Sequence, residues 1–238
     1  MSTEPAGRSR PFRIAAVSGR GTVWTMTRFY LDTEFLETGP AAPVELISLA
    51  LVTDDDRTLY LVNADFDRAR ASDWLRENVL PHLDRDGAPS PVPYSQFGPR
   101  ITEFVADVCA GAKPEFWMWS GAYDFVLLNG CFGRMVDTPP GWPKHFNDLR
   151  AWAGRLGNVT VQRTQPHEHD ALYDARHDRD AYQFLAATAK ARAAKAERRL
   201  RERLLADVTA VLRAPTAPAG ARKLPEPARS SGPDVQRS

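Results

Sequence analysis

The sequence predicts an α/β domain, because strand-like and helix-like segments share a single chain. Three apolar segments with strand character follow one another at the spacing of an antiparallel meander: residues 29–35, 45–52 and 57–62. A helical pattern covers residues 72–83, begins at a capping Ser72 and is expected to stop at Pro81, and further helices are expected at 101–110, 146–156 and from 178 to 213. A strand-like segment at 115–119 runs directly into another apolar helix. A meander at the start of the domain disfavours the nucleotide-binding α/β fold, whose strands are parallel.

The chain is long enough to bury one sizeable core and to carry tails. It has 238 residues, of which 43% are hydrophobic, and this length favours one domain over two small ones. We expect a mobile N-terminal extension over residues 1–26, the folded domain over 27–189, a basic helical extension over 190–213 and a disordered tail over 214–238.

The small net charge of +1 hides an uneven distribution. Residues 1–26 carry +3, residues 27–189 carry −9 and residues 190–238 carry +7. An acidic domain has no general positive field for nucleic acid, so any such affinity must come from metal ions or from a local basic patch. Residues 190–213 hold eight Lys or Arg and three acids, which fits a solvated amphipathic helix and also fits an arm that guides RNA or contacts a second copy.

Cysteine use and hydropathy indicate the compartment. Cys109 and Cys131 have no paired spacing, which argues against a disulfide scaffold or a zinc knuckle and fits a reducing environment. No apolar run is long enough to cross a bilayer, and the N-terminus lacks the apolar stretch of a secretory signal. We therefore expect a cytoplasmic protein without a membrane partner.

Two carboxylates, Asp32 and Glu34, interrupt the first strand-like segment. Their spacing places both on the same face of an extended strand. Taken alone, the pair fits an edge strand with one face in water. In a strand this apolar it also fits a hard divalent ion held by oxygen ligands.

Asp124 is the next acid that is a candidate for catalysis or metal binding. It lies in the first turn of an apolar helix just after a buried strand, a place where functional residues are common. The helix dipole alone would also favour an Asp there, by roughly 0.3–1 kcal/mol. The run of acids at residues 54–56 lacks the EF-hand pattern, and we interpret it as the turn of a hairpin.

His169 and Asp174 complete the pattern. His169 precedes a helix and Asp174 lies one turn inside it, so an imidazole and a carboxylate can converge on one site. A His with an Asp at this spacing, downstream of both Asp32-Thr33-Glu34 and Asp124, is hard to produce by chance.

These five positions resemble those of the DEDDh exonucleases of the ribonuclease-H-like superfamily. The matching segments are Leu-Asp-Thr-Glu-Phe at 31–35, Gly-Ala-Tyr-Asp at 121–124 and His-Asp-Ala-Leu-Tyr-Asp-Ala at 169–175. Within that group the chain is most similar to the polyadenylate-specific 3′-to-5′ exoribonucleases, over roughly residues 28–188. The resemblance rests in addition on Glu-Leu-Ile-Ser at 45–48 and on Trp-Met-Trp-Ser at 117–120.

The resemblance implies a five-stranded mixed sheet flanked by helices, two Mg²⁺ ions, single-stranded RNA as substrate and a homodimer. The enzyme would release nucleoside 5′-monophosphates and would prefer adenylate-rich 3′ ends. Phe35 and Leu36 are expected to wedge against the terminal base, and the backbone from Thr33 is expected to meet its sugar. By resemblance alone, Glu45 and Ser48 are candidates for reading an adenine edge, and each is equally credible as an ordinary strand residue.

The chemistry of the residues agrees with this interpretation. Two divalent ions roughly 4 Å apart can activate water and neutralise the leaving oxygen of a phosphodiester. The candidate metal ligands are Asp32, Glu34, Asp124 and Asp174. Their oxygen donors favour Mg²⁺ over zinc, and Mn²⁺ is a possible substitute. His169 can take a proton near neutral pH and is the candidate general base.

Two alternatives remain open at this stage. A metal centre does not itself distinguish ribose from deoxyribose, so DNA ends or short oligonucleotides are possible substrates. A nucleic-acid-binding protein without turnover would require a missing ligand, and none of the five residues is missing.

Overall fold

The structure is a computed structural model that describes residues 14–17, 23–37, 39 and 43–213. The chain forms two compact units, Met1–Ala191 and Arg192–Ser238. The tail predicted for residues 214–238 and most of the N-terminal extension predicted for residues 1–26 lie outside the described residues.

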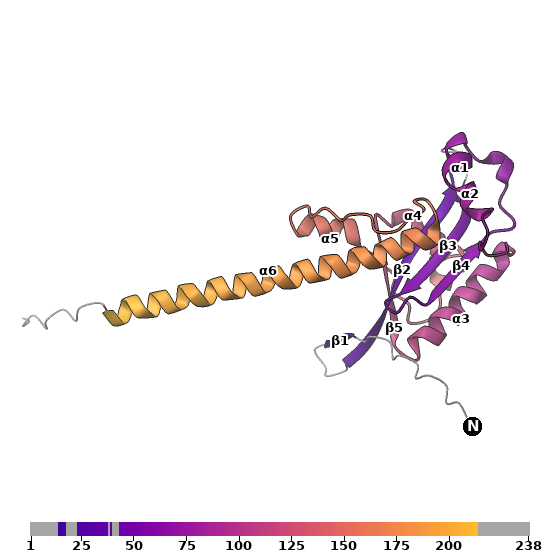
Figure 1. Ribbon diagram of the computed structural model, residues 1–238. Coiled ribbons are helices and arrows are strands. Elements are labelled where there is room, and N and C mark those ends of the chain that lie inside the picture. The colour runs from indigo at the N-terminus through magenta and orange to yellow at the C-terminus, as the bar shows by residue number, and fades with distance from the viewer. Residues whose placement is uncertain (1–13, 18–22, 38, 40–42, 214–238) are drawn as a thin grey trace, which may run out of the picture. The chain divides into compact units, whose positions relative to one another are not determined.

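A mixed sheet is the centre of the first unit (Figure 1). Its strands are β1 (Ile14–Val17), β2 (Val23–Leu36), β3 (Glu45–Thr53), β4 (Thr58–Val62), β5 (Lys113–Met118) and β6 (Asn147–Asp148). The order is β4-β3-β2-β5-β6, with β1 paired to β2. The pairs β1–β2, β2–β3 and β3–β4 are antiparallel, whereas β2–β5 and β5–β6 are parallel. The predicted five-stranded mixed sheet and its meander are confirmed.

The first strands extend further toward the N-terminus than the sequence predicts. The expected strand over 29–35 begins at Val23, and β1 pairs with this added portion, so the described sheet has six strands. All of β1 and the first residues of β2 lie in the predicted N-terminal extension. The apolar residues at 14–17 were too short a run to indicate a strand without the partner that β2 provides.

Six α-helices flank or follow the sheet: α1 (Asp73–Asn78), α2 (Leu80–Leu83), α3 (Phe97–Cys109), α4 (Ala122–Gly130), α5 (Leu149–Arg155) and α6 (Ala171–Arg213), counted over the described part of the chain. Short 3₁₀ helices occur at Arg68–Arg70, Tyr94–Gln96 and Met135–Asp137. None of the described helices combines the length and the apolar character that crossing a bilayer requires.

The predicted helix over residues 72–83 is divided in two. Ser72 caps it as expected, because its side chain accepts a hydrogen bond from the Leu75 N–H at 3.3 Å. The break falls at Val79, and Pro81 lies in the first turn of α2. The prediction that Pro81 ends a helix was wrong, since a proline in a first turn lacks only an N–H that has no partner there.

The core places α3 and α6 on opposite faces of the sheet. Phe29 and Leu31 of β2 pack with Phe97 and Ile101 of α3. Tyr30, which points to the other face, packs instead with the small side chains at the start of α6, Ala171 and Ala175. These alanines let α6 approach β2 closely, and Figure 1 shows the start of α6 crossing the sheet there.

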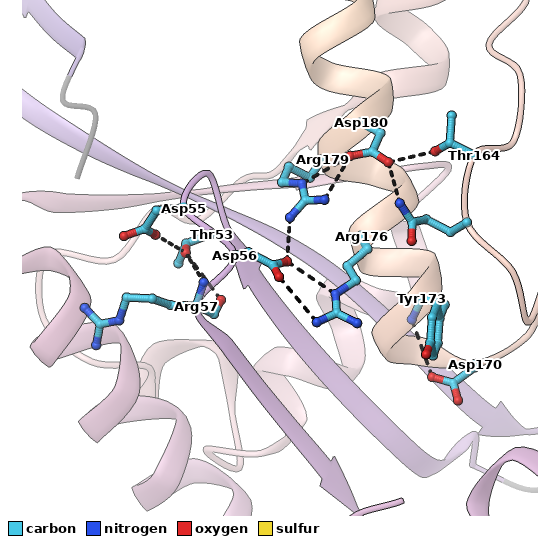
Figure 2. Close-up of polar contacts among 11 residues, drawn as sticks. Thr53, Asp55, Asp56, Arg57, Thr164, Asp170, Tyr173, Arg176, Arg179 and Asp180 are labelled. Atoms are coloured by element: carbon cyan, nitrogen blue, oxygen red, sulfur yellow. Dashed lines mark hydrogen bonds and ion pairs between the residues drawn. The ribbon is translucent and has the colours of Figure 1, made fainter. Parts of the chain in front are cut away.

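The tip of the β3–β4 hairpin is joined to α6. Asp56 adopts a left-handed backbone with φ of 62°, and the turn is closed by the Thr53 N–H, which donates to the Arg57 carbonyl at 3.0 Å. The Asp56 carboxylate accepts hydrogen bonds from Arg176 at 3.3 Å and from Arg179 at 2.5 Å (Figure 2). The interpretation of residues 54–56 as a hairpin turn is confirmed.

The helical part of the second unit carries exposed basic and exposed aliphatic side chains. Every side chain described between 192 and 213 is exposed. Basic side chains recur at helical spacing along one stripe and share one shallow cavity of about 450 Å³; they are Arg192, Lys195, Arg199 and Arg203. Aliphatic side chains with exposed fractions of 56–80% begin at Leu200, which lines the same cavity, and continue beyond the basic stripe; they are Leu200, Leu204, Leu205, Val208 and Leu212.

Candidate active site

Strand β2 supplies the first two carboxylates from the middle of the sheet. Side chains alternate along a strand, so Asp32 and Glu34 lie on the same side as Tyr30, which is the side covered by α6. Glu34 is 9% exposed. At these two residues β2 is paired with β3, and its pairing with β5 ends just before them, at Tyr30, so the two carboxylates project from a strand that is held in the sheet.

Helix α4 adds Asp124 directly beyond the end of β5. This residue is buried and its Oδ1 accepts two hydrogen bonds from Thr33, one from the backbone N–H at 2.9 Å and one from Oγ1 at 2.6 Å. Burial raises the pKa of Asp124, and the hydrogen bonds from Thr33 oppose the rise. Thr33, a predicted substrate contact, therefore ties β2 to α4 through both its N–H and its hydroxyl.

The loop before α6 and the first turn of that helix bring in His169 and Asp174. Asp174 Oδ2 accepts a hydrogen bond from the His169 N–H at 3.0 Å. Glu34, His169 and Asp174 each offer a ligand atom, and these atoms lie within 4.8 Å of one another. Asp32, His169 and Asp174 also line one cavity of about 350 Å³.

The carboxylates affect one another strongly. Burial raises the pKa of Asp32 well above its ordinary range, and the charges of Asp124 and Glu34 raise it further. Burial, followed by the charges of Asp174 and Asp124, raises the pKa of Glu34 to about 8. A divalent cation would relieve this repulsion, and the donor set of carboxylate oxygens with one imidazole fits Mg²⁺ or Mn²⁺.

Three further side chains adjoin the site without having been predicted there. Asp178 is buried and its Oδ2 accepts a hydrogen bond from the Trp119 N–H at 2.9 Å, and burial raises its pKa well above the usual range. It lies four residues after Asp174 on the same helix face, a spacing that could have indicated it. Trp74 meets the His169 ring edge-on, with centroids 4.7 Å apart.

Arg163 is the third unpredicted residue. It lines the same cavity as Asp32 and forms an ion pair with Asp174 Oδ1. It comes from a loop without secondary structure between α5 and α6. Since no periodicity or spacing relates an irregular loop to a distant strand, the sequence carried no signal for it.

The predicted substrate-contacting residues fall into two groups. Phe35 stacks on Tyr123, with ring centroids 5.2 Å apart, and lines a cavity of about 280 Å³ with Glu34 and Trp74. Leu36 and Ser48 are 1% and 0% exposed, so their side chains cannot touch RNA in this structure. The prediction for Leu36 and Ser48 relied on their position in the chain, whereas in the sheet both side chains point toward the protein interior.

Glu45 has a different environment from the carboxylates. Its Oε2 forms an ion pair with Arg70 at 3.0 Å, and it lines a separate cavity of about 510 Å³. The structure thus brings together the five predicted catalytic residues and Phe35, and it places Glu45 elsewhere.

Comparison with known proteins identifies the family. No family model matches the chain. Two relatives, from two strains of Mycobacterium tuberculosis, are each named 3′-5′ exoribonuclease and are 35% identical over 162 residues, which cover 68% of this chain and 94% of the relative. The chain belongs to this family of 3′-5′ exoribonucleases. The expectation of a hydrolytic enzyme of the exonuclease class is thereby confirmed.

Solved structures of exonucleases are similar at low identity. One is the nuclease domain of 3′hExo, a DEDDh family member bound to rAMP, with 13% identity, a TM-score of 0.44 and coverage of 66% of this chain and 88% of the other. Another is a full-length 3′-exonuclease with 12% identity, a TM-score of 0.38 and coverage of 69% and 82%. At these scores the two structures add nothing to the functional assignment of the exoribonuclease family.

Proposed function

We propose that this chain is a metal-dependent 3′-to-5′ exoribonuclease that degrades single-stranded RNA to nucleoside 5′-monophosphates. The observation that carries the proposal is the convergence of four carboxylates and one imidazole at a single site. Strand β2, helix α4 and helix α6 each contribute to it. The names of the relatives support RNA as the substrate and the 3′ end as the point of attack.

The proposed metal ligands are Asp32, Glu34, Asp124 and Asp174. Two bound Mg²⁺ ions would supply an activated water molecule and would neutralise charge at the scissile phosphate. Burial, followed by the charges of Asp174 and Asp124, raises the pKa of Glu34 to about 8, and this supports the assignment because the site is unfavourable for its own carboxylates without a cation.

His169 is the proposed general base. Its ring is partly buried, and its backbone N–H donates to Asp174 at 3.0 Å, which fixes the residue beside the carboxylates. Trp74 contacts the imidazole edge-on. An imidazole held in this way is placed to accept the proton of the attacking water.

The terminal nucleotide is proposed to occupy the cavity beside Glu34. Phe35 and Trp74 line that cavity of about 280 Å³, and Trp74 is 50% exposed. Aromatic faces bind bases by stacking, at roughly 1–3 kcal/mol per base. Stacking supports recognition of any base, so it does not by itself distinguish adenine.

A preference for adenylate-rich 3′ ends is part of the proposal and rests on the sequence resemblance. Glu45 could accept a hydrogen bond from adenine N6 only after leaving Arg70, to which it is bound at 3.0 Å. Rates on poly(A), poly(U) and poly(C) of equal length should differ by about tenfold, since one specific base contact contributes roughly 1–3 kcal/mol. Equal rates would reject the adenylate preference and leave the nuclease assignment intact.

The deciding experiment is degradation of end-labelled RNA and DNA homopolymers. Activity on RNA with Mg²⁺ or Mn²⁺, loss of activity with chelator and shortening from the 3′ end would support the proposal. Faster digestion of single-stranded DNA would transfer the assignment to the DNA alternative. The homodimer and the cytoplasmic location stay predictions, to be checked by sedimentation and by imaging.

A further inference from the structure

We propose that Arg163 contacts the phosphate group of the RNA at the point of cleavage, and that Asp180 positions the loop that carries it. The inference rests on the proposed exoribonuclease function. It concerns the irregular loop between α5 and α6, of which Thr164 and Gln165 are the next two residues.

Arg163 occupies the catalytic cavity itself. Its side chain is 28% exposed and forms an ion pair with Asp174 Oδ1, while the other oxygen of that carboxylate accepts the His169 N–H. Arg163 is the one arginine or lysine among the described residues that line this cavity. Beside any bound metal ion, its guanidinium is thus the cationic side-chain group that a substrate phosphate can meet there.

The chemistry of the cavity favours such a role. A phosphodiester is anionic and gains negative charge on the way to the transition state, so the carboxylates of the site repel it. Arginine offers N–H donors in a planar fork that matches two phosphate oxygens. A donor that is already held in place stabilises developing charge without the reorganisation that water would need.

The pairing of Arg163 with Asp174 predicts opposite effects on metal binding and on RNA cleavage. Asp174 is also a proposed metal ligand, so a cation and the guanidinium compete for the same carboxylate. Removing the guanidinium should therefore ease metal binding while it weakens RNA cleavage. A residue that merely stabilised the site would be expected to weaken both.

A polar network holds the loop of Arg163 on α6. Thr164 Oγ1 and Gln165 Nε2 both donate to Asp180 Oδ2, at 2.7 and 2.6 Å. Asp180 is also paired with Arg179 at 3.0 Å, and Arg179 donates to Asp56 of the β3–β4 hairpin, as Figure 2 shows. Because α6 also carries Asp174, the network fixes Arg163 relative to its carboxylate partner.

The test measures metal binding and RNA cleavage separately in the full-length chain. For Arg163→Gln we expect the dissociation constant of Mg²⁺ alone, measured by calorimetry, to stay constant or to fall. We expect kcat/KM on a short ribo-oligonucleotide to fall by about 10- to 100-fold, the usual value of a charge-assisted hydrogen bond. Arg163→Lys should recover part of this loss, because it keeps the charge without the fork.

Arg176→Gln is the matched control. It removes the same charge from a side chain of similar exposure, 25%, that binds Asp56 and does not line the cavity. Asp180→Ala should lower kcat/KM in the same direction as Arg163→Gln without changing Mg²⁺ affinity. Thermal melting of each variant separates this effect from loss of the fold.

Two results would overturn the inference. One is a kcat/KM for Arg163→Gln within about threefold of the value for Arg176→Gln. The other is a loss of Mg²⁺ affinity in Arg163→Gln, which would assign Arg163 to the support of the metal site. A wild-type chain that fails to degrade RNA with Mg²⁺ would instead refute the proposed function, so the two failures are distinguishable.

Discussion

Removal of metal should make the fold sensitive to pH in an unusual direction. Burial and the neighbouring carboxylates raise the pKa of Glu34 from 4.5 to about 8 in the folded chain. The folded state therefore holds this proton more tightly than the unfolded state. Its contribution to stability is fully present below about pH 4.5 and is lost as the pH rises through about 8, so the metal-free protein should be less stable at pH 8 than at pH 5.

The size of the effect follows from the same values. Between pH 4.5 and pH 7 the folded state loses roughly 3 kcal/mol from Glu34 alone, at 1.36 kcal/mol per pH unit. Asp32 shifts in the same direction and adds to the loss. For a chain of this size each kcal/mol changes the melting temperature by about 2–4 °C, so a decrease of roughly 6–12 °C is expected.

The assay is thermal melting of the chelated protein at pH 5 and pH 8, with and without Glu34→Gln. The glutamine variant should melt at a higher temperature than wild type at pH 8 and should lose the part of the pH dependence that Glu34 contributes, while the part from Asp32 remains. Glu37→Gln, at an exposed position three residues further on, is the control and should behave as wild type. A Glu34→Gln variant that is less stable than wild type at pH 8 would refute the assignment of electrostatic repulsion to this site.

Other predictions concern turnover and RNA binding. Asp124→Asn should fold and should lower turnover by several orders of magnitude at ordinary Mg²⁺; near-normal activity would contradict the metal-ligand role. His169→Ala should lose about 10²- to 10⁴-fold in kcat and recover partly at high pH, with His167→Ala as the active control. If His167→Ala were the impaired variant, the assignment of the base would be wrong. Replacing the four basic side chains of the stripe (Arg192, Lys195, Arg199 and Arg203) by Gln should weaken binding of long RNA. It should also reduce the slope of log K against log salt concentration by up to about 3, at about 0.7 per phosphate contact. Cleavage of dinucleotides should not change, and an unchanged slope would leave this helix without an RNA role.

The sequence was informative wherever local chemistry determines structure. Three features could be predicted because each depends on residues close together in the chain. They are the strand that carries Asp32 and Glu34, the cap at Ser72 and the helix whose first turn holds Asp124. The convergence of His169 and Asp174 with β2 came from the resemblance and from their spacing. In the structure, the small side chains at the start of α6 let this helix pack on Tyr30, and this packing brings the two residues close to β2.

Contacts between distant irregular segments could not be predicted. Arg163 lies in a loop, and its pairing with Asp174 depends on how Thr164 and Gln165 are held by Asp180. The burial of Ser48 has a similar origin, because the face on which a strand residue lies depends on the pairing register. A register shift between Glu34 and Phe35 alters the pairing of β2 with β3 at this point.

The backbone of the loop before α6 bears on how far this enzyme can be stabilised. His167 and His169 both have left-handed conformations, with φ of 57° and 66°. Such conformations cost a non-glycine residue roughly 1–2 kcal/mol, a cost that glycine avoids. A glycine at His167 would relax one of these positions at no expense to the proposed base, whereas the same change at His169 would remove the imidazole. The loop therefore offers one place where backbone strain can be relieved without removing the proposed base, and one where relief of strain and catalysis are in direct conflict.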